Sequence, residues 1–384
     1  MRCLIIKLRR FDYYDDLRKA CTDNGIHAVT EYCESVADSE NILLAIDRFR
    51  PDFILNHPMF SIVVSRIGAA KSIPVLHWVV DKCLNNKYFQ TDLYNKTDFI
   101  FLTYRDDAEK LAALGVKAKY LPNACNIEPV APQVAEQPYG VSFVGTIEMG
   151  ENNYYRRSAE LARMKLNQES PDQTPLFEHM LAACDAILQQ QNAASKEFRY
   201  ILPELVARAY GQKGNILQVS GLQPDDLTLL LTKEAAFKQR RHFFQAIPHL
   251  EAFGPPDWQQ AELPNVHYRG ALPLRTSGKV FAASRINLSL TRIYALDGLS
   301  DRLFNVLAAR GFLLANRQTT LSEIFQEGID LETYATVEEL LDKIRFYENH
   351  PLAREKIARH GQENVARNHT FTNRIREMLT LISG

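Results

Sequence analysis

The sequence lacks a large net charge of either sign, because its 384 residues carry 45 Lys and Arg against 46 Asp and Glu, a formal net charge of −1. A protein that binds nucleic acid through its phosphates needs an excess of basic residues, so this balance argues against a nucleic-acid partner. It leaves room for a basic site that binds one small phosphate-bearing ligand. The hydrophobic fraction of 46% and the charged fraction of 24% are ordinary for globular chains and exclude long disordered or fibrous segments.

The sequence also lacks the patterns of metal sites, disulfide frameworks and membrane spans. Its six cysteines lie far apart, with no C-x-x-C pair and no cluster of Cys and His, which favours reduced, mostly buried thiols. No run approaches the roughly 18 to 20 apolar residues of a spanning helix. The apolar start of the chain is interrupted too early for a secretory signal. We therefore expect a cytoplasmic protein without a metal or a transmembrane segment.

Short apolar runs alternate with amphipathic stretches in the first 125 residues, which predicts strands alternating with helices and hence a parallel sheet covered on both faces. The predicted fold class is α/β, with two Rossmann-like lobes facing a cleft and a helical insertion in the second lobe. Strands are predicted at 3–8, 27–32, 52–56, 74–80, 98–103 and 118–122, and helices at 14–24, 39–49, 62–71 and 105–114.

The rest of the chain divides into a linker, a second lobe and a final helix. Residues 126–140 contain three prolines and read as a linker. Long amphipathic stretches with almost no strand pattern predict a helical insertion at about 151–247, and the alternation resumes at 249. The predicted domains are an N-terminal lobe at 1–130, a C-terminal lobe at 139–368 and a last helix at 369–384.

One predicted helix carries a cation where its dipole disfavours it. A predicted strand at 286–290 runs into a loop with Gly298, and a helix pattern begins at Ser300 or Asp301. The first turn of a helix presents free N–H groups and the positive end of the dipole. Arg302 lies in that turn, and an anionic ligand such as a diphosphate would explain its position. The alternative is an N-cap followed by a solvated or salt-bridged arginine.

This region resembles a known family. SDRLFNVLA at 300–308, followed by GFLL at 311–314, is similar to a signature of the CgeB-type (spore-maturation-protein-like) glycosyltransferases. Other similar stretches occur in the family's order: HWVVD at 77–81, LPNACN at 121–126, VSFVGT at 141–146, YRG at 268–270, INLSL at 286–290 and HTF at 369–371. The resemblance covers most of the chain except the helices at 151–247.

The resemblance implies a GT-B fold, in which the final helix crosses back to the first lobe. It implies a nucleotide-sugar donor of UDP or GDP type on the second lobe and an unknown acceptor on the first. The donor-binding residues that it implies are Gly145 and Thr146 facing the donor, Arg269 and Gly270 near the nucleotide, and Arg292, Ser300, Asp301, Arg302 and Asn305 around the diphosphate and ribose. Related retaining enzymes often carry Glu in place of Asn305, and Asn cannot act as a base.

The resemblance also implies that neither a cofactor nor a metal is needed, because GT-B enzymes neutralise the diphosphate with cationic side chains and helix dipoles. The sequence contains no D-x-D triplet, the metal–diphosphate clamp of the other major glycosyltransferase fold.

Two residues of the first lobe are candidate catalytic groups. Asp81 directly follows an apolar strand, which places its carboxylate at the cleft, where it could accept a proton from an acceptor hydroxyl. The alternative is a loop carboxylate that caps nearby amides. His57 follows the preceding strand and is the second candidate. His77 is interpreted as a core residue, Trp78 as core or a sugar platform, and the basic stretch 238–244 as a solvated helix face with a buried Phe stripe.

The sequence therefore predicts a glycosyltransferase, with retention of the anomeric configuration implied by the family. Two other functions stay open at this point. One is a sugar-nucleotide 2-epimerase of the same fold. The other is a non-enzymatic module that binds glycans or nucleotides, for which the helices at 151–247 are a candidate docking surface for a partner.

Overall fold

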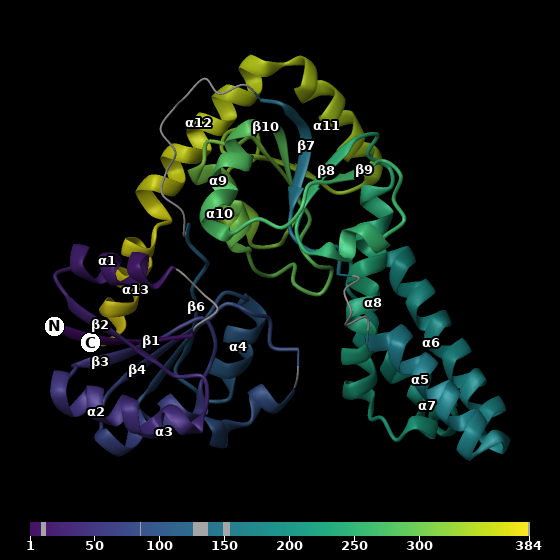
Figure 1. The fold of residues 1–384 in the computed structure, drawn as a ribbon, viewed down its shortest axis with the longest axis horizontal. Helices are drawn as coiled ribbons and strands as arrows, with labels where there is room; N and C mark the ends of the chain where they lie inside the picture. The colour runs from purple at the N-terminus through teal and green to yellow at the C-terminus, as the bar shows by residue number, and fades with distance from the viewer. Residues whose placement is uncertain (9–12, 85, 126–136, 149–153, 383–384) are drawn as a thin grey trace.

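The computed structural model describes residues 1–8, 13–84, 86–125, 137–148 and 154–382. Within these ranges it contains two parallel β-sheets of six strands each, with helices between the strands and a helical segment beside the second sheet (Figure 1). The predicted fold class, two Rossmann-like lobes with a helical insertion in the second, is confirmed. Most of the predicted linker at 126–140 and the predicted start of the insertion at 151–153 lie outside the described residues.

The first lobe is a sheet in the order β2-β1-β3-β4-β5-β6, and all its neighbouring strands are parallel. Its strands β3 and β4 are buried along their whole length, as their near-continuous apolar runs require when helices cover both faces. The elements are β1 (Arg2–Lys7), α1 (Tyr14–Asp23), β2 (His27–Tyr32), α2 (Ser39–Phe49), β3 (Phe53–Asn56), α3 (Ile62–Lys71), β4 (Val75–Val79), β5 (Asp98–Leu102), α4 (Arg105–Ala113) and β6 (Ala118–Tyr120).

The second lobe has the strand order β12-β11-β10-β7-β8-β9, also parallel throughout. From β7 the chain adds strands outward on one side (β8, β9) and from β10 on the other side (β11, β12), so the strand order switches direction between β7 and β10. Ligands of open α/β sheets bind outside the carboxyl ends of the strands at such a point. The sequence patterns missed β12 and α9. The elements are β7 (Tyr139–Val144), β8 (Leu250–Phe253), β9 (Val266–Tyr268), α9 (Leu274–Ala283), β10 (Ser284–Ser289), α10 (Asp301–Ala308), β11 (Leu313–Asn316), β12 (Glu332–Tyr334), α11 (Val337–Asn349) and α12 (Pro351–Asn368).

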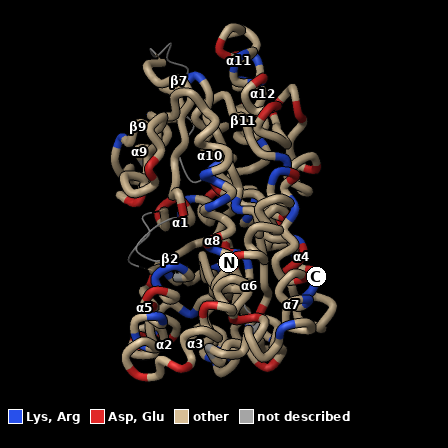
Figure 2. The backbone as a smooth tube through the Cα atoms, turned by 90° about the vertical axis from the view of Figure 1, so that its right-hand side faces the viewer, with Lys and Arg blue, Asp and Glu red and all other residues tan. Residues whose placement is uncertain are grey.

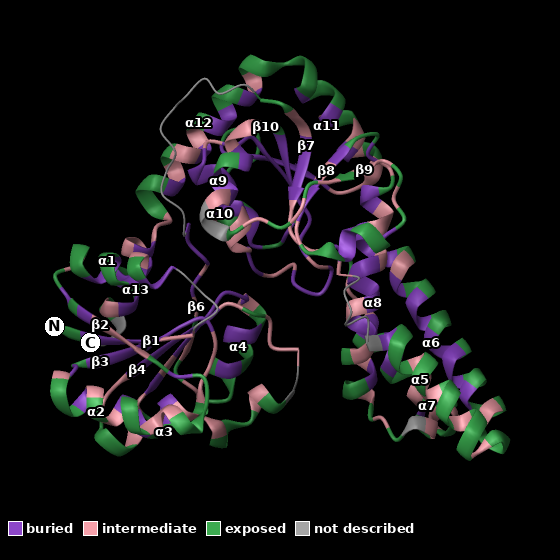
Figure 3. Cartoon of the chain, viewed as in Figure 1, coloured by how far each residue is buried: buried purple, intermediate pink, exposed green. Residues whose placement is uncertain are grey.

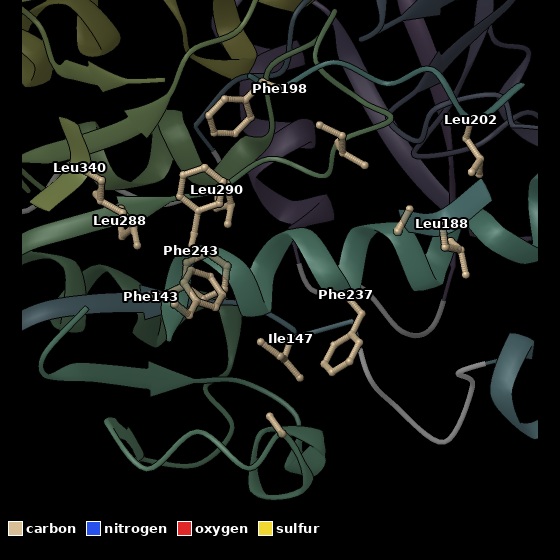
Figure 4. Packing of buried hydrophobic residues seen from close by; sticks show 14 of the residues in the cluster. Phe143, Ile147, Leu188, Phe198, Leu202, Phe237, Phe243, Leu288, Leu290 and Leu340 are labelled. Atoms are coloured by element: carbon tan, nitrogen blue, oxygen red, sulfur yellow. The ribbon is translucent and has the colours of Figure 1, made fainter. Parts of the chain in front are cut away.

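The insertion between β7 and β8 consists of α5 (Tyr154–Glu169), α6 (Thr174–Ser195), α7 (Leu202–Leu217) and α8 (Pro224–Phe244). Its outer faces are exposed, whereas its inner faces are buried (Figure 3). Phe237 and Phe243 of α8 belong to the same hydrophobic cluster as Phe143 of β7 and Leu288 of β10 (Figure 4). Because one apolar core joins them, the insertion is packed onto the second sheet rather than tethered to it.

The final helix, α13 (Phe371–Ile382), lies beside α1 of the first lobe (Figure 1). Its residues Phe371, Ile375 and Met378 are buried in the core of that lobe. Arg374 is 1% exposed and donates to the carbonyls of Pro122 and Asn123 at 2.8 and 3.0 Å. The chain therefore returns from the second lobe to complete the first.

The two lobes touch directly at residues 297–299. Lys82 Nζ lies 2.7 Å from both carboxylate oxygens of Asp297. Tyr104 forms an isolated antiparallel bridge with Gly298, where a Cβ would lie 2.4 Å from the carbonyl oxygen of Thr103. Only glycine allows so close an approach, so Gly298 sets how the lobes meet on this side of the cleft.

Acidic and basic residues are interspersed over the chain (Figure 2). Each of the six cysteines is free and five are buried, which confirms the prediction of buried thiols. No helix in the described part of the chain has the length and apolarity needed to cross a membrane. The same residues contain no group of three or more His, Cys, Asp or Glu side chains that could hold a metal ion.

Candidate functional site

The carboxyl ends of β7 and β10 bring three loops together at the point where the strand order reverses. The first is the loop after β7, which holds Gly145, Thr146 and Glu148, and the second follows β10 and holds Arg292. The third is the start of α10 at Asp301. Helix α8 of the insertion reaches the same edge, because Arg240 donates to the carbonyl of Thr146.

Glu148 is the centre of a cluster of cations. Its carboxylate lies 2.8 Å from Arg292 Nε, 3.4 Å from Arg240 Nη1 and 3.4 Å from Lys233 Nζ. The Glu148 side chain is 5% exposed, and its backbone has a φ of 67°, in the left-handed region. Burial would raise the pKa of Glu148, but the charges of Arg240, Arg292 and Lys233 outweigh it and hold that pKa at about 2. The carboxylate is therefore ionised at any physiological pH.

Arg240 is a member of this cluster that the sequence patterns did not identify. The interpretation of 238–244 as a solvated face is wrong for it, since Arg240 is 2% exposed. Burial lowers the pKa of Arg240 to about 9, against the opposing effect of Glu148, so the side chain stays protonated at neutral pH. The spacing of this arginine from its aromatic neighbours could have predicted its burial. Arg240 follows Phe237 by three residues and precedes Phe243 by three, which places it on the buried stripe of the helix.

Arg302, the second residue of α10, faces the same cluster. Its guanidinium carbon lies 4.6 Å from the centroid of the Phe143 ring. A Cβ on Gly145 would lie 2.4 Å from Arg302 Nη2, so the guanidinium covers the end of β7. Burial lowers the pKa of Arg302 to about 10. Within the described residues, no hydrogen bond or ion pair reaches this guanidinium, and the buried Ser300 Oγ at the N-cap has no partner.

The arrangement has an excess of positive charge. Lys233, Arg240 and Arg292 surround one enclosed carboxylate, and Arg302 is a fourth cation on which Asp301 and this carboxylate act. Because buried like charges repel, such a cluster is most stable when an anion joins it. The N-terminus of α10 adds free N–H groups and the positive end of a dipole. The site can therefore bind an anion that carries more than one negative charge.

A cavity of about 540 Å³ opens next to this cluster. Its wall includes Lys82 and Arg105 of the first lobe, Tyr200 and Thr228 of the insertion, and Tyr294 of the second lobe. Tyr294 joins the cavity to the cluster, since its hydroxyl lies 3.4 Å from Lys233 Nζ. Three parts of the chain thus enclose one space beside the cations.

The whole chain is similar in structure to several solved proteins. It superimposes on HepE of Anabaena in complex with UDP and glucose, with a TM-score of 0.53, 10% identity and coverage of 100% of this chain and 99% of that one. For sucrose-phosphate synthase from Thermosynechococcus elongatus the TM-score is 0.54, with 12% identity and coverage of 100% and 98%. For AviGT4, a glycosyltransferase involved in avilamycin A biosynthesis, the TM-score is 0.51, with 9% identity and coverage of 99% of this chain and 96% of that one. This chain has the GT-B fold.

The comparison of sequences matches a shorter part of the chain than the comparison of structures does. A family model described as glycosyl transferase-like matches residues 235–380, which span α10 and all strands of the second GT-B lobe except β7. Arg240, Arg292 and Arg302 fall inside this match, whereas Glu148 and the cavity residues of the first lobe fall outside it. No curated protein matches the sequence.

The other predicted donor-binding residues occupy different places on the second GT-B lobe. Thr146 lies in the cluster loop, where its hydroxyl donates to Asp257 at 3.1 Å and accepts from the Glu148 N–H at 2.9 Å. Asn305 is 1% exposed on α10. Arg269 follows the edge strand β9, and its exposed side chain is paired with Glu251 at 2.6 Å. Gly270, with a φ of 96°, accepts at its carbonyl from the Gly254 N–H.

The two candidate catalytic residues of the first GT-B lobe differ in exposure. Asp81 is exposed in the loop that follows β4. His57 is buried after β3, where its ring centroid lies 4.6 Å from that of Trp78. Its Nδ1 is 3.0 Å from the Trp78 carbonyl, which can only accept, so Nδ1 carries the proton and Nε2 is free to accept. Burial lowers the pKa of His57 to about 4, so its ring is neutral at neutral pH.

The buried state of His57 predicts an acid-sensitive first lobe. The unfolded chain protonates this ring near its ordinary pKa of 6.5, whereas the folded chain does so at about 4. Burial of the neutral His57 ring therefore does not reduce the stability of the folded state above pH 6.5, and it reduces that stability progressively as the pH falls from 6.5 toward 4. Between pH 7 and 5, the free energy of unfolding is expected to fall by about 2 kcal/mol more in wild type than in His57→Gln. Urea unfolding followed by tryptophan fluorescence measures both values. Parallel pH dependences for the two proteins would contradict this.

Proposed function

We propose that this protein is a glycosyltransferase that transfers a sugar from a nucleoside diphosphate sugar to an acceptor hydroxyl. The observation that carries the proposal is the cluster of Lys233, Arg240, Arg292 and Arg302 at the switch point of the second lobe. The glycosyl transferase-like match over 235–380 supports it, and so does the similarity to HepE, one structure of which holds UDP-glucose.

The cluster would act on the leaving group. In the transfer, the bond from the sugar C1 to the diphosphate breaks, a bond from C1 to the acceptor oxygen forms, and the hydroxyl proton leaves to a base. Negative charge builds on the departing diphosphate, and fixed cations around it lower the barrier. We propose that Arg292, Arg302 and Lys233 supply this charge without a metal ion. Arg240 positions the loop after β7 through its bond to the Thr146 carbonyl.

The remaining assignments complete the proposed donor site. The N–H groups at Ser300 and Asp301 would hold the diphosphate, Gly145 and Thr146 would face the sugar, and Asn305 would bind the ribose. Arg269 and Gly270 would lie toward the base, at the outer edge of the sheet. The family resemblance alone supports retention of the anomeric configuration, which NMR of the product tests.

The donor is tested by nucleotide binding to the full chain. UDP-, GDP-, dTDP- and CMP-sugars are added one at a time and the unfolding midpoint is recorded, because a ligand that binds only the folded state raises it. We expect one of the diphosphate nucleotides to raise the midpoint, and calorimetry then gives its dissociation constant. If no nucleotide of the panel binds, the proposal is wrong. Conversion of the donor without an acceptor would indicate an epimerase instead.

Asp81 is proposed as the group that accepts the acceptor proton. Asp81→Asn is expected to lower turnover by about 100-fold or more, as removal of a general base does. Donor affinity measured by calorimetry is expected to stay within twofold, because Asp81 belongs to the first lobe. Asp92→Asn, another exposed aspartate of that lobe, is the matched control and should keep wild-type turnover. Unchanged turnover in Asp81→Asn would remove this residue from the mechanism.

We propose that Gly145 leaves the space that the Arg302 guanidinium occupies, because it has no side chain. A methyl group there would lie 2.4 Å from Arg302 Nη2 and 3.0 Å from the Phe143 ring, and a φ of 155° disfavours any side chain. Gly145→Ala is therefore expected to displace the guanidinium and weaken binding of the nucleoside diphosphate about tenfold. Gly211→Ala is the control, since no atom lies within 4 Å of a Cβ at that position. Wild-type affinity in Gly145→Ala would contradict the assignment.

A further inference from the structure

The cavity beside the cation cluster has a wall that the two lobes do not supply. Pro203 and Thr228 line it together with Tyr200 and Thr232, and all four come from the insertion. Lys82 and Leu84 of the first lobe also line it, as do Ile293 and Tyr294 of the second. A volume of about 540 Å³ is that of a pocket for a small ligand or for the end of a longer one.

The charges in the cavity wall are already paired. Lys82 Nζ lies 2.7 Å from Asp297 and 3.4 Å from Asp107, and Arg105 forms an ion pair with Glu323. The cations are therefore neutralised by carboxylates, three of which (Asp106, Asp297 and Glu323) also line the space. An acidic or phosphorylated ligand would meet no uncompensated positive charge in this wall, unlike in the neighbouring cluster. The wall therefore disfavours an anionic ligand.

The remaining lining groups include hydroxyls and aromatic rings that are held in fixed positions. Tyr200 OH lies 2.7 Å from Thr232 Oγ1, whose own hydroxyl donates to the Thr228 carbonyl at 2.7 Å. Thr228 Oγ1 donates to the Pro224 carbonyl at 2.8 Å, which leaves its oxygen lone pairs able to accept. The rings of Tyr200 and Tyr294 meet edge to face with centroids 6.3 Å apart. Hydroxyl acceptors next to rigid apolar surfaces suit a ligand rich in hydroxyl groups.

The cavity is also close enough to the cluster to take part in its reaction. Tyr294, which lines the cavity, contacts Lys233, and Lys233 contacts Glu148. Tyr104 of the first lobe, Ala236 of α8 and Tyr294 share one small hydrophobic cluster, so the three walls are packed against one another here. A ligand in the cavity would therefore lie beside the proposed donor site at the cation cluster.

We propose that this cavity binds the acceptor, that the acceptor is a neutral carbohydrate, and that the insertion selects it through Tyr200, Pro203 and Thr228. This inference rests on the proposed glycosyltransferase function, and it assigns the insertion a role in substrate choice rather than in partner docking. Thr228 is a specificity residue: it touches the acceptor and takes no part in donor binding.

The test uses the full chain, the donor that the nucleotide panel identifies, and two matched acceptors, methyl β-glucoside and methyl β-glucuronide, which differ in one carboxylate. Release of nucleoside diphosphate is followed. We expect the neutral glucoside to be used with at least tenfold higher kcat/KM than the glucuronide. Thr228→Phe, which fills the cavity, is expected to raise the KM for the glucoside at least tenfold. The donor dissociation constant and the slow release without acceptor should stay within twofold of wild type.

Thr22→Phe is the matched control, because Thr22 is an exposed helical threonine that also donates to the carbonyl four residues earlier. If Thr228→Phe does not fold, Thr228→Met takes its place. Equal use of both acceptors, or an unchanged KM in the folded variant, would overturn this inference. So would use of neither acceptor by a protein that binds the donor, and the proposed donor site would then stand. Failure to bind any nucleotide would overturn both.

Discussion

Arg302→Ala is expected to weaken binding of the nucleoside diphosphate by about 10- to 150-fold, equivalent to the loss of roughly 1.5–3 kcal/mol from a hydrogen bond to a charged group. The guanidinium has no ion-pair partner among the described residues, it lies over Phe143, and it occupies the first turn of α10. In the free protein its charge is opposed by burial, which lowers its pKa to about 10. Its removal should therefore cost affinity and turnover rather than stability. Calorimetry and the unfolding midpoint measure the two separately.

The control for Arg302 lies just beyond the other end of the same helix. Arg310 follows α10 and forms an ion pair with Glu355, so Arg310→Ala should leave nucleotide affinity unchanged. Arg302→Lys keeps the charge but loses the planar fork, and an intermediate affinity is expected. If Arg302→Ala binds the nucleotide as wild type does, the donor site is not at this helix.

Glu148→Ala is expected to have the largest effect on stability, with a loss of about 3–5 kcal/mol in the free energy of unfolding of the second lobe. Removing the carboxylate leaves Arg240, Arg292 and Lys233 close together without their common partner. Trp258 reports on this region, because its Nε1–H donates to the Gly145 carbonyl at 2.7 Å. Urea unfolding followed by tryptophan fluorescence therefore measures the change.

An added anion should partly reverse this loss. Pyrophosphate or UDP can take the place of the missing carboxylate, so either should raise the unfolding midpoint more in Glu148→Ala than in wild type. Glu178→Ala is the control, since Glu178 is 45% exposed in its pair with Arg163 and exposed pairs contribute about 0–1 kcal/mol. A variant as stable as this control, with no greater response to anions, would show that the cluster does not depend on its carboxylate.

These two expectations describe complementary parts of one site. Glu148 holds three cations in place before any ligand arrives, whereas Arg302 has no hydrogen-bond or ion-pair partner among the residues that the structure describes. Charges that are already oriented need no rearrangement when negative charge develops on a leaving group. The carboxylate thus positions the cations, and the unpaired arginine provides the charge that a diphosphate would meet.

The sequence by itself determined the fold class and the position of Arg302 in the first turn of a helix. Strands β3 and β4 are uniform apolar runs because both faces of a parallel sheet are covered, and alternation with helices forces the parallel arrangement. Helix starts follow from local backbone chemistry, so Arg302 could be placed in a first turn from a few neighbouring residues. The short strand β12 carried no such pattern in its three residues, and it was missed.

Only the tertiary structure decided which charges meet. Glu148 is separated along the chain from Lys233, Arg240 and Arg292 by 85, 92 and 144 residues. The same holds for the cavity, whose walls come from both lobes and the insertion. Electrostatic interactions depend on distance through space and on burial, and neither follows from separation along the chain. Arg240 of a basic stretch that looked solvated therefore became part of a buried cation cluster once α8 packed against β7 and β10.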